Sequence, residues 1–143
     1  MDFDVALGRR EFASAVAVYV SGCLDSPEES PANAEIEPGS TVELDGQASG
    51  WLGRSPSDIE GDRNPTLVLE EGARYVFRWV NADGAPHDLQ IRGEDDEVVD
   101  ELVSERVETR GEGASLEFTA STEMEEYVCS FHRSSQSGRL VVE

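Results

Sequence analysis

Short runs of alternating apolar and polar residues recur along the chain from residue 41 onward. In the clearest run, residues 74–80, the alternation places Tyr75, Phe77 and Trp79 on one face. A period of two is typical of a strand that rests one face against a core. Further runs of this kind cover residues 66–69, 87–91, 115–119, 126–131 and 139–142. Such regularly spaced strands, separated by Gly-rich turns, predict an all-β domain built as a β-sandwich.

Two segments between these runs are harder to assign. Residues 98–107 carry apolar pairs at helical spacing, but their β-branched content favours extended structure. Residues 51–64 contain several Gly and Pro residues, and we expect them to form a long loop.

The charge of the chain is strongly acidic. Its 143 residues, enough for one ordinary domain, include 31 Asp and Glu against 11 Lys and Arg, for a formal net charge of −20. All of the basic residues are Arg, and such a surface repels both nucleic acid and an anionic membrane. The composition resembles that of haloarchaeal proteins, which are adapted to molar salt. The alternative is an acidic, solvated face on a protein that works at ordinary salt concentrations.

The first part of the chain resembles an export signal. Arg9 and Arg10 precede a short apolar stretch, as in a twin-arginine signal, and the stretch is too short to span a bilayer. The sequence VSGC that follows resembles a lipobox, in which Cys23 becomes the lipidated first residue of the mature protein. Two alternatives stay open: a buried N-terminal helix with an incidental Cys, and a disulfide between Cys23 and Cys129.

A Ser-, Pro- and Glu-rich stretch follows Cys23 and lacks apolar periodicity. The sequence therefore predicts three parts: a signal at residues 1–22, a flexible linker at 23–39 that begins with the lipidated Cys23, and a folded domain at 40–143.

Two of the predicted strands carry residues with metal-binding chemistry. His87 begins the run 87–91, on the face that the apolar residues of that run share. Cys129 shares a face with Tyr127 and Phe131. If these apolar side chains face the core, His87 and Cys129 point into the same interior.

His132 lies three residues after Cys129, just past the predicted strand end. A thiolate and two imidazoles suit copper or zinc, and a trigonal Cys-His-His set with a weak axial ligand is the arrangement of electron-transfer copper sites. A Cys-x-x-His pair alone is a weak signal, because an isolated core Cys is usually a small hydrophobic residue. Together, His87, Cys129 and His132 predict a metal site.

The surrounding motifs resemble those of cupredoxins. NADGAPHD, residues 81–88, is similar to the segment that carries the first copper histidine, and YVCSFHRSSQSGRLVV, residues 127–142, is similar to the terminal ligand loop and last strand. The resemblance covers residues 40–143. With the export signal and the acidity, it points to the halocyanins, plastocyanin-like proteins of haloarchaea. It implies a Greek-key β-sandwich with one mononuclear type 1 blue copper, held by the imidazoles of His87 and His132 and the thiolate of Cys129.

The sequence departs from the cupredoxin pattern at the axial position. The family usually has Met two residues before the loop Gly, and here Gly138 places Gln136 at that position. Gln is an attested axial ligand, and its harder oxygen donor favours Cu(II). The alternatives are that Ser137 coordinates, or that the site has no axial ligand and Gln136 is a polar loop residue.

A second departure is Asp88, because relatives often carry Asn after the first His. An ionised carboxylate accepts hydrogen bonds but does not donate them. Either Asp88 is protonated, or protein N–H and O–H groups turn toward it.

The resemblance implies a one-electron carrier rather than an enzyme, because a single closed copper site leaves no place for a substrate. We expect a monomer at the outer face of the cytoplasmic membrane, held there by its lipid anchor alone. Its partners would be redox proteins of a membrane electron-transport chain. Three alternatives stay open: copper storage or delivery, an enzyme with an open metal position, and a metal-free interaction module.

Overall fold

The computed structural model describes residues 33–143. The predicted export signal with Arg9 and Arg10, and the predicted lipid attachment at Cys23, lie outside the described residues. No helix in the described range is long and apolar enough to cross a membrane.

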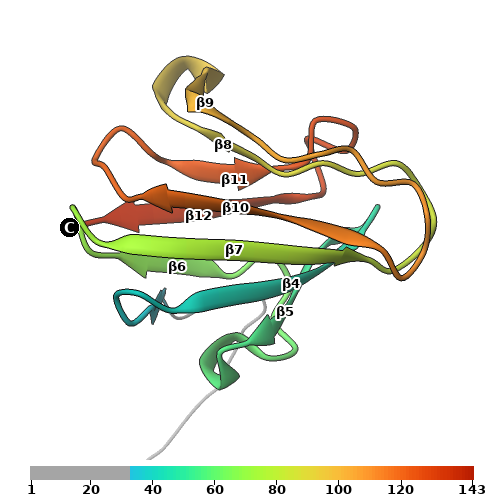
Figure 1. Cartoon of the computed structure of the whole chain (residues 1–143), viewed down its shortest axis with the longest axis horizontal. Coiled ribbons are helices and arrows are strands. Elements are labelled where there is room, and N and C mark those ends of the chain that lie inside the picture. The colour runs from blue at the N-terminus through green and yellow to red at the C-terminus, as the bar shows by residue number, and fades with distance from the viewer. Residues whose placement is uncertain (1–32) are drawn as a thin grey trace, which may run out of the picture. The chain divides into compact units, whose positions relative to one another are not determined.

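Two β-sheets face each other in this part of the chain (Figure 1). The four-stranded sheet has the spatial order β10 (Gly113–Thr119), β7 (Arg74–Asn81), β4 (Thr41–Gln47) and β5 (Gly50–Ser55). The six-stranded sheet has the order β3 (Asn33–Glu35), β6 (Thr66–Leu69), β12 (Ser137–Val142), β11 (Glu126–Val128), β8 (Gln90–Arg92) and β9 (Val98–Val103). Two short 3-10 turns complete the fold, η2 (Ser57–Ile59) and η3 (Glu94–Asp96). The predicted β-sandwich is confirmed.

The core lies between the two sheets and is rich in aromatic residues. Tyr75, Phe77 and Trp79 all point inward from β7, as the alternation predicts. The ring of Phe77 meets Phe118 of the same sheet edge to face at 5.0 Å, and meets Tyr127 of the opposite sheet at 6.1 Å. Such contacts stabilise beyond the area that they bury, so the Phe77–Tyr127 contact helps hold the two sheets together.

Some element boundaries differ from the sequence expectation. The run 87–91 is a regular strand only from Gln90, while His87 forms an isolated bridge with Val107. The extended interpretation of 98–107 is confirmed as far as Val103.

The prediction of a loop over 51–64 is wrong for its first part, because β5 covers Gly50–Ser55 and pairs with β4. Glycines hide the pattern of this strand. A Cβ on Gly53 would lie 2.1 Å from the carbonyl oxygen of Ile59, so close backbone approach requires Gly there.

The predicted linker 23–39 also overlaps the sheet. β3 lies inside that range and pairs in parallel with β6. Ile36 is buried in the core. Residues 33–36 therefore belong to the sandwich, although their sequence is too short and polar to show a strand pattern.

Candidate metal centre

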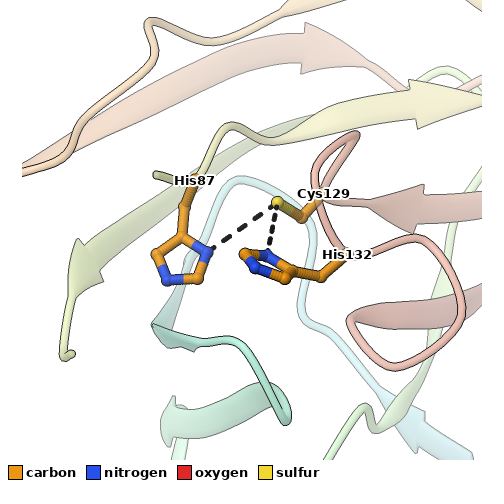
Figure 2. Close-up of side chains that lie close together, drawn as sticks. All are labelled: His87, Cys129 and His132. Carbon is orange, nitrogen blue, oxygen red and sulfur yellow. Dashed lines mark hydrogen bonds between the residues drawn. The ribbon is translucent and has the colours of Figure 1, made fainter. Parts of the chain in front are cut away.

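The three predicted ligands come from two loops at one end of the sandwich (Figure 2). His87 lies in the connection from β7 to β8. Its backbone exchanges two hydrogen bonds with Val107, at 3.1 and 2.9 Å. Cys129 follows the last residue of β11, and His132 lies in the loop from β11 to β12. Neighbouring strands of one sheet therefore bring the two loops together.

The ligand atoms of these residues converge. The Sγ atom of Cys129 lies 3.8 Å from Nδ1 of His87 and 3.6 Å from Nδ1 of His132. One ligand atom from each residue falls within 4.8 Å of the other two. His87 and Cys129 are buried, and His132 is partly buried. The structure thus gathers all three residues that the sequence singles out.

The loop 129–136 closes on itself through backbone hydrogen bonds. The N–H of Cys129 donates to the carbonyl of Gln136 at 3.0 Å, and the N–H of His132 donates to the carbonyl of Cys129 at 3.2 Å. The N–H of Gln136 donates to the carbonyl of His132 at 2.8 Å. These bonds fix the relative positions of Cys129, His132 and Gln136.

This turn also explains one wrong prediction. Phe131 was expected to face the core, but it is 43% exposed. β11 ends at Val128, so the period-two alternation does not extend into the turn. The Phe131 ring instead lies beside the guanidinium of Arg106, 5.4 Å from ring centroid to Cζ.

Burial raises the pKa of the Cys129 thiol, although the backbone N–H groups of Asp88, Phe131 and His132 oppose that rise. The negative charge of Asp88 raises the pKa further. The site therefore holds a neutral thiol when no cation is present, while its amide groups are placed to stabilise a thiolate. A metal ion that takes the place of the proton would supply the missing positive charge.

Asp88 lies between the two ligand loops. Its carboxylate accepts hydrogen bonds from the N–H of Ser130 at 2.8 Å and from the hydroxyl of Ser130 at 2.9 Å. The amide of Gln90 donates to it at 3.2 Å. Of the two alternatives for Asp88, the structure supports the one in which protein donors turn toward the carboxylate. The segment that carries His87 is thereby tied to the residue after Cys129.

Gln136 is fully buried, with 0% exposure, and neither its Oε1 nor its Nε2 has a hydrogen-bond partner among residues 33–143. Buried amides rarely lack partners, because the unmade hydrogen bonds cost free energy. A Cβ placed on Gly46 would lie 3.4 Å from Nε2 of Gln136 and 3.2 and 3.3 Å from the rings of Trp51 and Trp79. The same two rings flank His87, at centroid distances of 6.5 and 6.2 Å. Gly46 therefore lies close both to the amide of Gln136 and to the two Trp rings that pack on His87.

One residue near the site was missed by the sequence analysis. Asp83 Oδ1 lies 2.8 Å from Nε2 of His87. Burial alone would raise the pKa of Asp83, but hydrogen bonds from the N–H of Ala48, from His87 and from the N–H of Ala85 hold it below its ordinary value. The only sequence signal is an acidic residue four positions before a His, and that spacing is uninformative without the geometry of the loop.

These donors fit the single copper ion that the sequence predicts. One thiol sulfur and two imidazole nitrogens form the soft and borderline set that copper prefers. Among residues 33–143, nothing bonds to the buried amide of Gln136, so its oxygen is not committed to another protein group.

No protein-family model matches the sequence, and no curated protein matches it. Solved structures do match. Rusticyanin from Thiobacillus ferrooxidans superposes with a TM-score of 0.54 at 16% identity, over 81% of this chain and 85% of that chain. A rusticyanin variant gives a TM-score of 0.53 at 18% identity, over 81% and 84% of the two chains. Auracyanin A, a "blue" copper protein from Chloroflexus aurantiacus, gives 0.52 at 17% identity, over 73% of this chain and 100% of that chain. Rusticyanin and auracyanin are blue copper cupredoxins, and at these identities the likeness shows the fold: the described part of this chain has the fold of the cupredoxins.

Proposed function

We propose that the chain is a one-electron carrier that holds a single type 1 copper through His87, Cys129 and His132, with Gln136 as the axial ligand. The observation that carries the proposal is the convergence of one sulfur and one nitrogen from each of two imidazoles within 4.8 Å of one another, in a sandwich with the cupredoxin fold. The bound copper would supply the one-electron couple between Cu(I) and Cu(II). The blue copper proteins among the structural neighbours support the same assignment.

The protein's part in this function is to keep the ligands still. His87 is held by backbone bonds to Val107 and is fully buried, and the loop 129–136 is closed by its own hydrogen bonds. Ligands that are fixed in this way move little when the charge of the centre changes, which favours fast electron transfer. His132 is only partly buried and stands next to the exposed Phe131, so we propose that electrons pass through the edge of His132.

This proposal includes no catalytic residue. His87 and Cys129 have 0% exposure, and an axial Gln136 would close the remaining side of the site. The alternative, an enzyme with an open metal position, requires that Gln136 does not coordinate. Azide would then bind to the copper-loaded protein and change its visible spectrum, whereas a closed site predicts no change.

The visible spectrum of the copper-loaded full chain tests the proposal. We expect an intense thiolate-to-copper band near ~600 nm. The chain has only two Cys, which provides a matched pair of variants. Cys129→Ser should abolish the band, and Cys23→Ser should keep it. Absence of the band in the wild-type protein, or its survival in Cys129→Ser, would contradict the proposal.

Reversible redox cycling separates an electron carrier from a copper store. The carrier proposal predicts that the loaded protein passes repeatedly between its oxidised and reduced forms. Tight Cu(I) binding without reversible oxidation would instead favour the alternative of copper storage or delivery.

We further propose that the carrier is exported, lipid-anchored at Cys23 and tethered to the outer face of the cytoplasmic membrane. There it would exchange electrons with redox-partner proteins as a monomer. The support is the twin-arginine-like pair Arg9 and Arg10 and the lipobox-like sequence before Cys23. Mass spectrometry of the mature N-terminus is the test: we expect a lipid-modified Cys23, and an unmodified Met1 would refute the anchor.

The halocyanin-like, salt-adapted character is proposed from the net charge of −20 and the absence of Lys. Molar salt screens repulsion between acidic groups, since the Debye length falls to about 3 Å at 1 M. Thermal unfolding measured across a salt series should therefore show rising stability. Equal or greater stability at low salt would count against salt adaptation.

A further inference from the structure

Asp83 holds one imidazole of the proposed site through a carboxylate whose two oxygens are both used. Its Oδ1 lies 2.8 Å from Nε2 of His87 and accepts the N–H of Ala85 at 3.1 Å. Its Oδ2 accepts the N–H of Ala48 at 2.8 Å. These contacts come from three places in the sequence, so the carboxylate is fixed from several sides.

The loop that carries Asp83 is itself built by a buried side chain. Asn81 Oδ1 accepts the N–H groups of Asp83 and Gly84 at 3.1 and 2.6 Å. Its Nδ2 donates to the carbonyls of Ala85 and Val107 at 2.7 and 3.0 Å. The backbone of the turn that places Asp83 near His87 is thus fixed by Asn81.

This geometry selects one tautomer of His87. An ionised carboxylate can only accept, so the proton of a neutral imidazole belongs on Nε2, where it is donated to Asp83. Nδ1 then carries the lone pair. Nδ1 is also the atom that faces the sulfur of Cys129, at 3.8 Å (Figure 2).

The two imidazoles of the site differ in this respect. Within residues 33–143, the hydrogen bond between His87 and the carboxylate of Asp83 has no counterpart at His132. A carboxylate that accepts from a ligating His fixes the ring and makes its other nitrogen a stronger donor. His87 is therefore the anchored ligand, and His132 depends on its loop alone.

Asp83 is also linked to the loop that carries His132, through Ala48. Ala48, whose N–H donates to Asp83, also accepts a hydrogen bond from the hydroxyl of Ser135 at 2.6 Å through its carbonyl. Ser135 belongs to the loop between His132 and Gln136. The turn after β4 therefore contacts both halves of the site.

We propose that Asp83 is a positioning residue that fixes the Nε2–H tautomer of His87 and strengthens Nδ1 as a donor to the metal ion. The choice of copper as that ion rests on the proposed function, but the role of Asp83 applies to any divalent ion at the site. In the copper protein, a stronger nitrogen donor stabilises Cu(II), so Asp83 lowers the reduction potential.

The first test needs no variant. Nitrogen-15 NMR of the metal-free full chain reports which ring nitrogen of each His carries the proton. We expect the Nε2–H form at His87. The proposal does not require either tautomer at His132. A predominant Nδ1–H form at His87 would overturn the proposal.

The second test compares two variants that each lose one negative charge. Asp83→Asn removes the carboxylate beside His87. Asp45→Asn removes a carboxylate on β4 that pairs with Arg54 at 3.0 Å, outside the site. We expect zinc, which has no redox chemistry, to bind Asp83→Asn on the order of 10- to 100-fold more weakly than wild type, and Asp45→Asn to bind it like wild type.

The reduction potential completes the comparison. Asp83→Asn should raise the potential of the copper-loaded protein more than Asp45→Asn does. Equal zinc binding and equal potentials in the two variants would refute the role of Asp83. The proposed copper function would still stand if the wild-type protein shows the blue band. A missing blue band in the wild-type protein would refute the proposed function, and the tautomer and zinc measurements would still decide the role of Asp83.

Discussion

Replacing Gln136 with Met should stabilise the metal-free protein, although it replaces a proposed ligand. Gln136 is fully buried, and in the described part of the chain its amide oxygen and nitrogen have no hydrogen-bond partner. A buried polar group without a partner costs about 1–3 kcal/mol. Met is unbranched, similar in size and free of strong donors and acceptors. The variant should therefore gain about 1–3 kcal/mol in the free energy of unfolding, or ~4 °C in melting temperature for each kcal/mol.

Gln90→Met provides the matched control. Gln90 is also buried, but its Nε2 donates to Asp88 at 3.2 Å and its Oε1 accepts from Nε of Arg92 at 2.9 Å. Met at this position removes satisfied hydrogen bonds and leaves partners unpaired, so this variant should lose about 1–3 kcal/mol. The same chemical change is thus expected to have opposite signs at the two positions.

The assay is urea unfolding of both variants and the wild-type chain, after removal of metal with a chelator and at one salt concentration. If Gln136→Met destabilises the metal-free protein as much as Gln90→Met does, the amide of Gln136 makes hydrogen bonds to the protein and is not free to coordinate a metal. In the copper-loaded protein, the softer thioether should raise the reduction potential. An unchanged potential and spectrum would exclude coordination by Gln136.

Three further predictions concern the core and the metal-free site. Gly138→Ala would place a Cβ 2.1 Å from Cζ of the buried Tyr127, so we expect a loss of at least about 1–3 kcal/mol in urea unfolding; a change near zero would mean that the ring has room to move. Burial raises the pKa of Cys129 above its ordinary value of 9.0, so the unfolded chain ionises first as the pH rises. The metal-free protein should therefore lose stability as the pH rises past about 9, and copper loading, which displaces the thiol proton, should remove this loss; a loss of equal size in both forms would contradict the assignment. Trp51 and Trp79 are the chain's two Trp residues and both lie against the buried imidazole of the site, so Cu(II) should quench most of the tryptophan fluorescence, and unquenched emission at full loading would place the metal elsewhere.

The sandwich was predictable because its longest strands carry the clearest alternation. The inward face of β7, with Tyr75, Phe77 and Trp79, follows directly from a period of two. β3 and β5 were not predictable. β3 is a three-residue strand, and β5 contains glycines that are needed where its backbone meets the carbonyl of Ile59. β3 pairs with the distant strand β6, whereas β5 pairs with the preceding strand β4 but its glycines interrupt the alternation that would reveal it.

The candidate site was predictable in its ligand types but not in its supporting contacts. Cys129 and His132 stand three residues apart in a recognisable motif. His87 was predicted because it shares one face of the run 87–91 with apolar residues. Asp83 was missed because its role depends on the turn that Asn81 builds. The prediction that Phe131 faces the core was wrong because the alternation ends with β11 at Val128, where backbone hydrogen bonds turn the chain.

X-ray absorption at the copper edge of the loaded full chain tests the central claim most directly. It identifies the atoms bound to the metal, without relying on colour or redox behaviour. The account predicts one sulfur and two imidazole nitrogens in the first coordination shell, with at most one weak further ligand. A shell without sulfur, made up only of nitrogen and oxygen atoms, would contradict it.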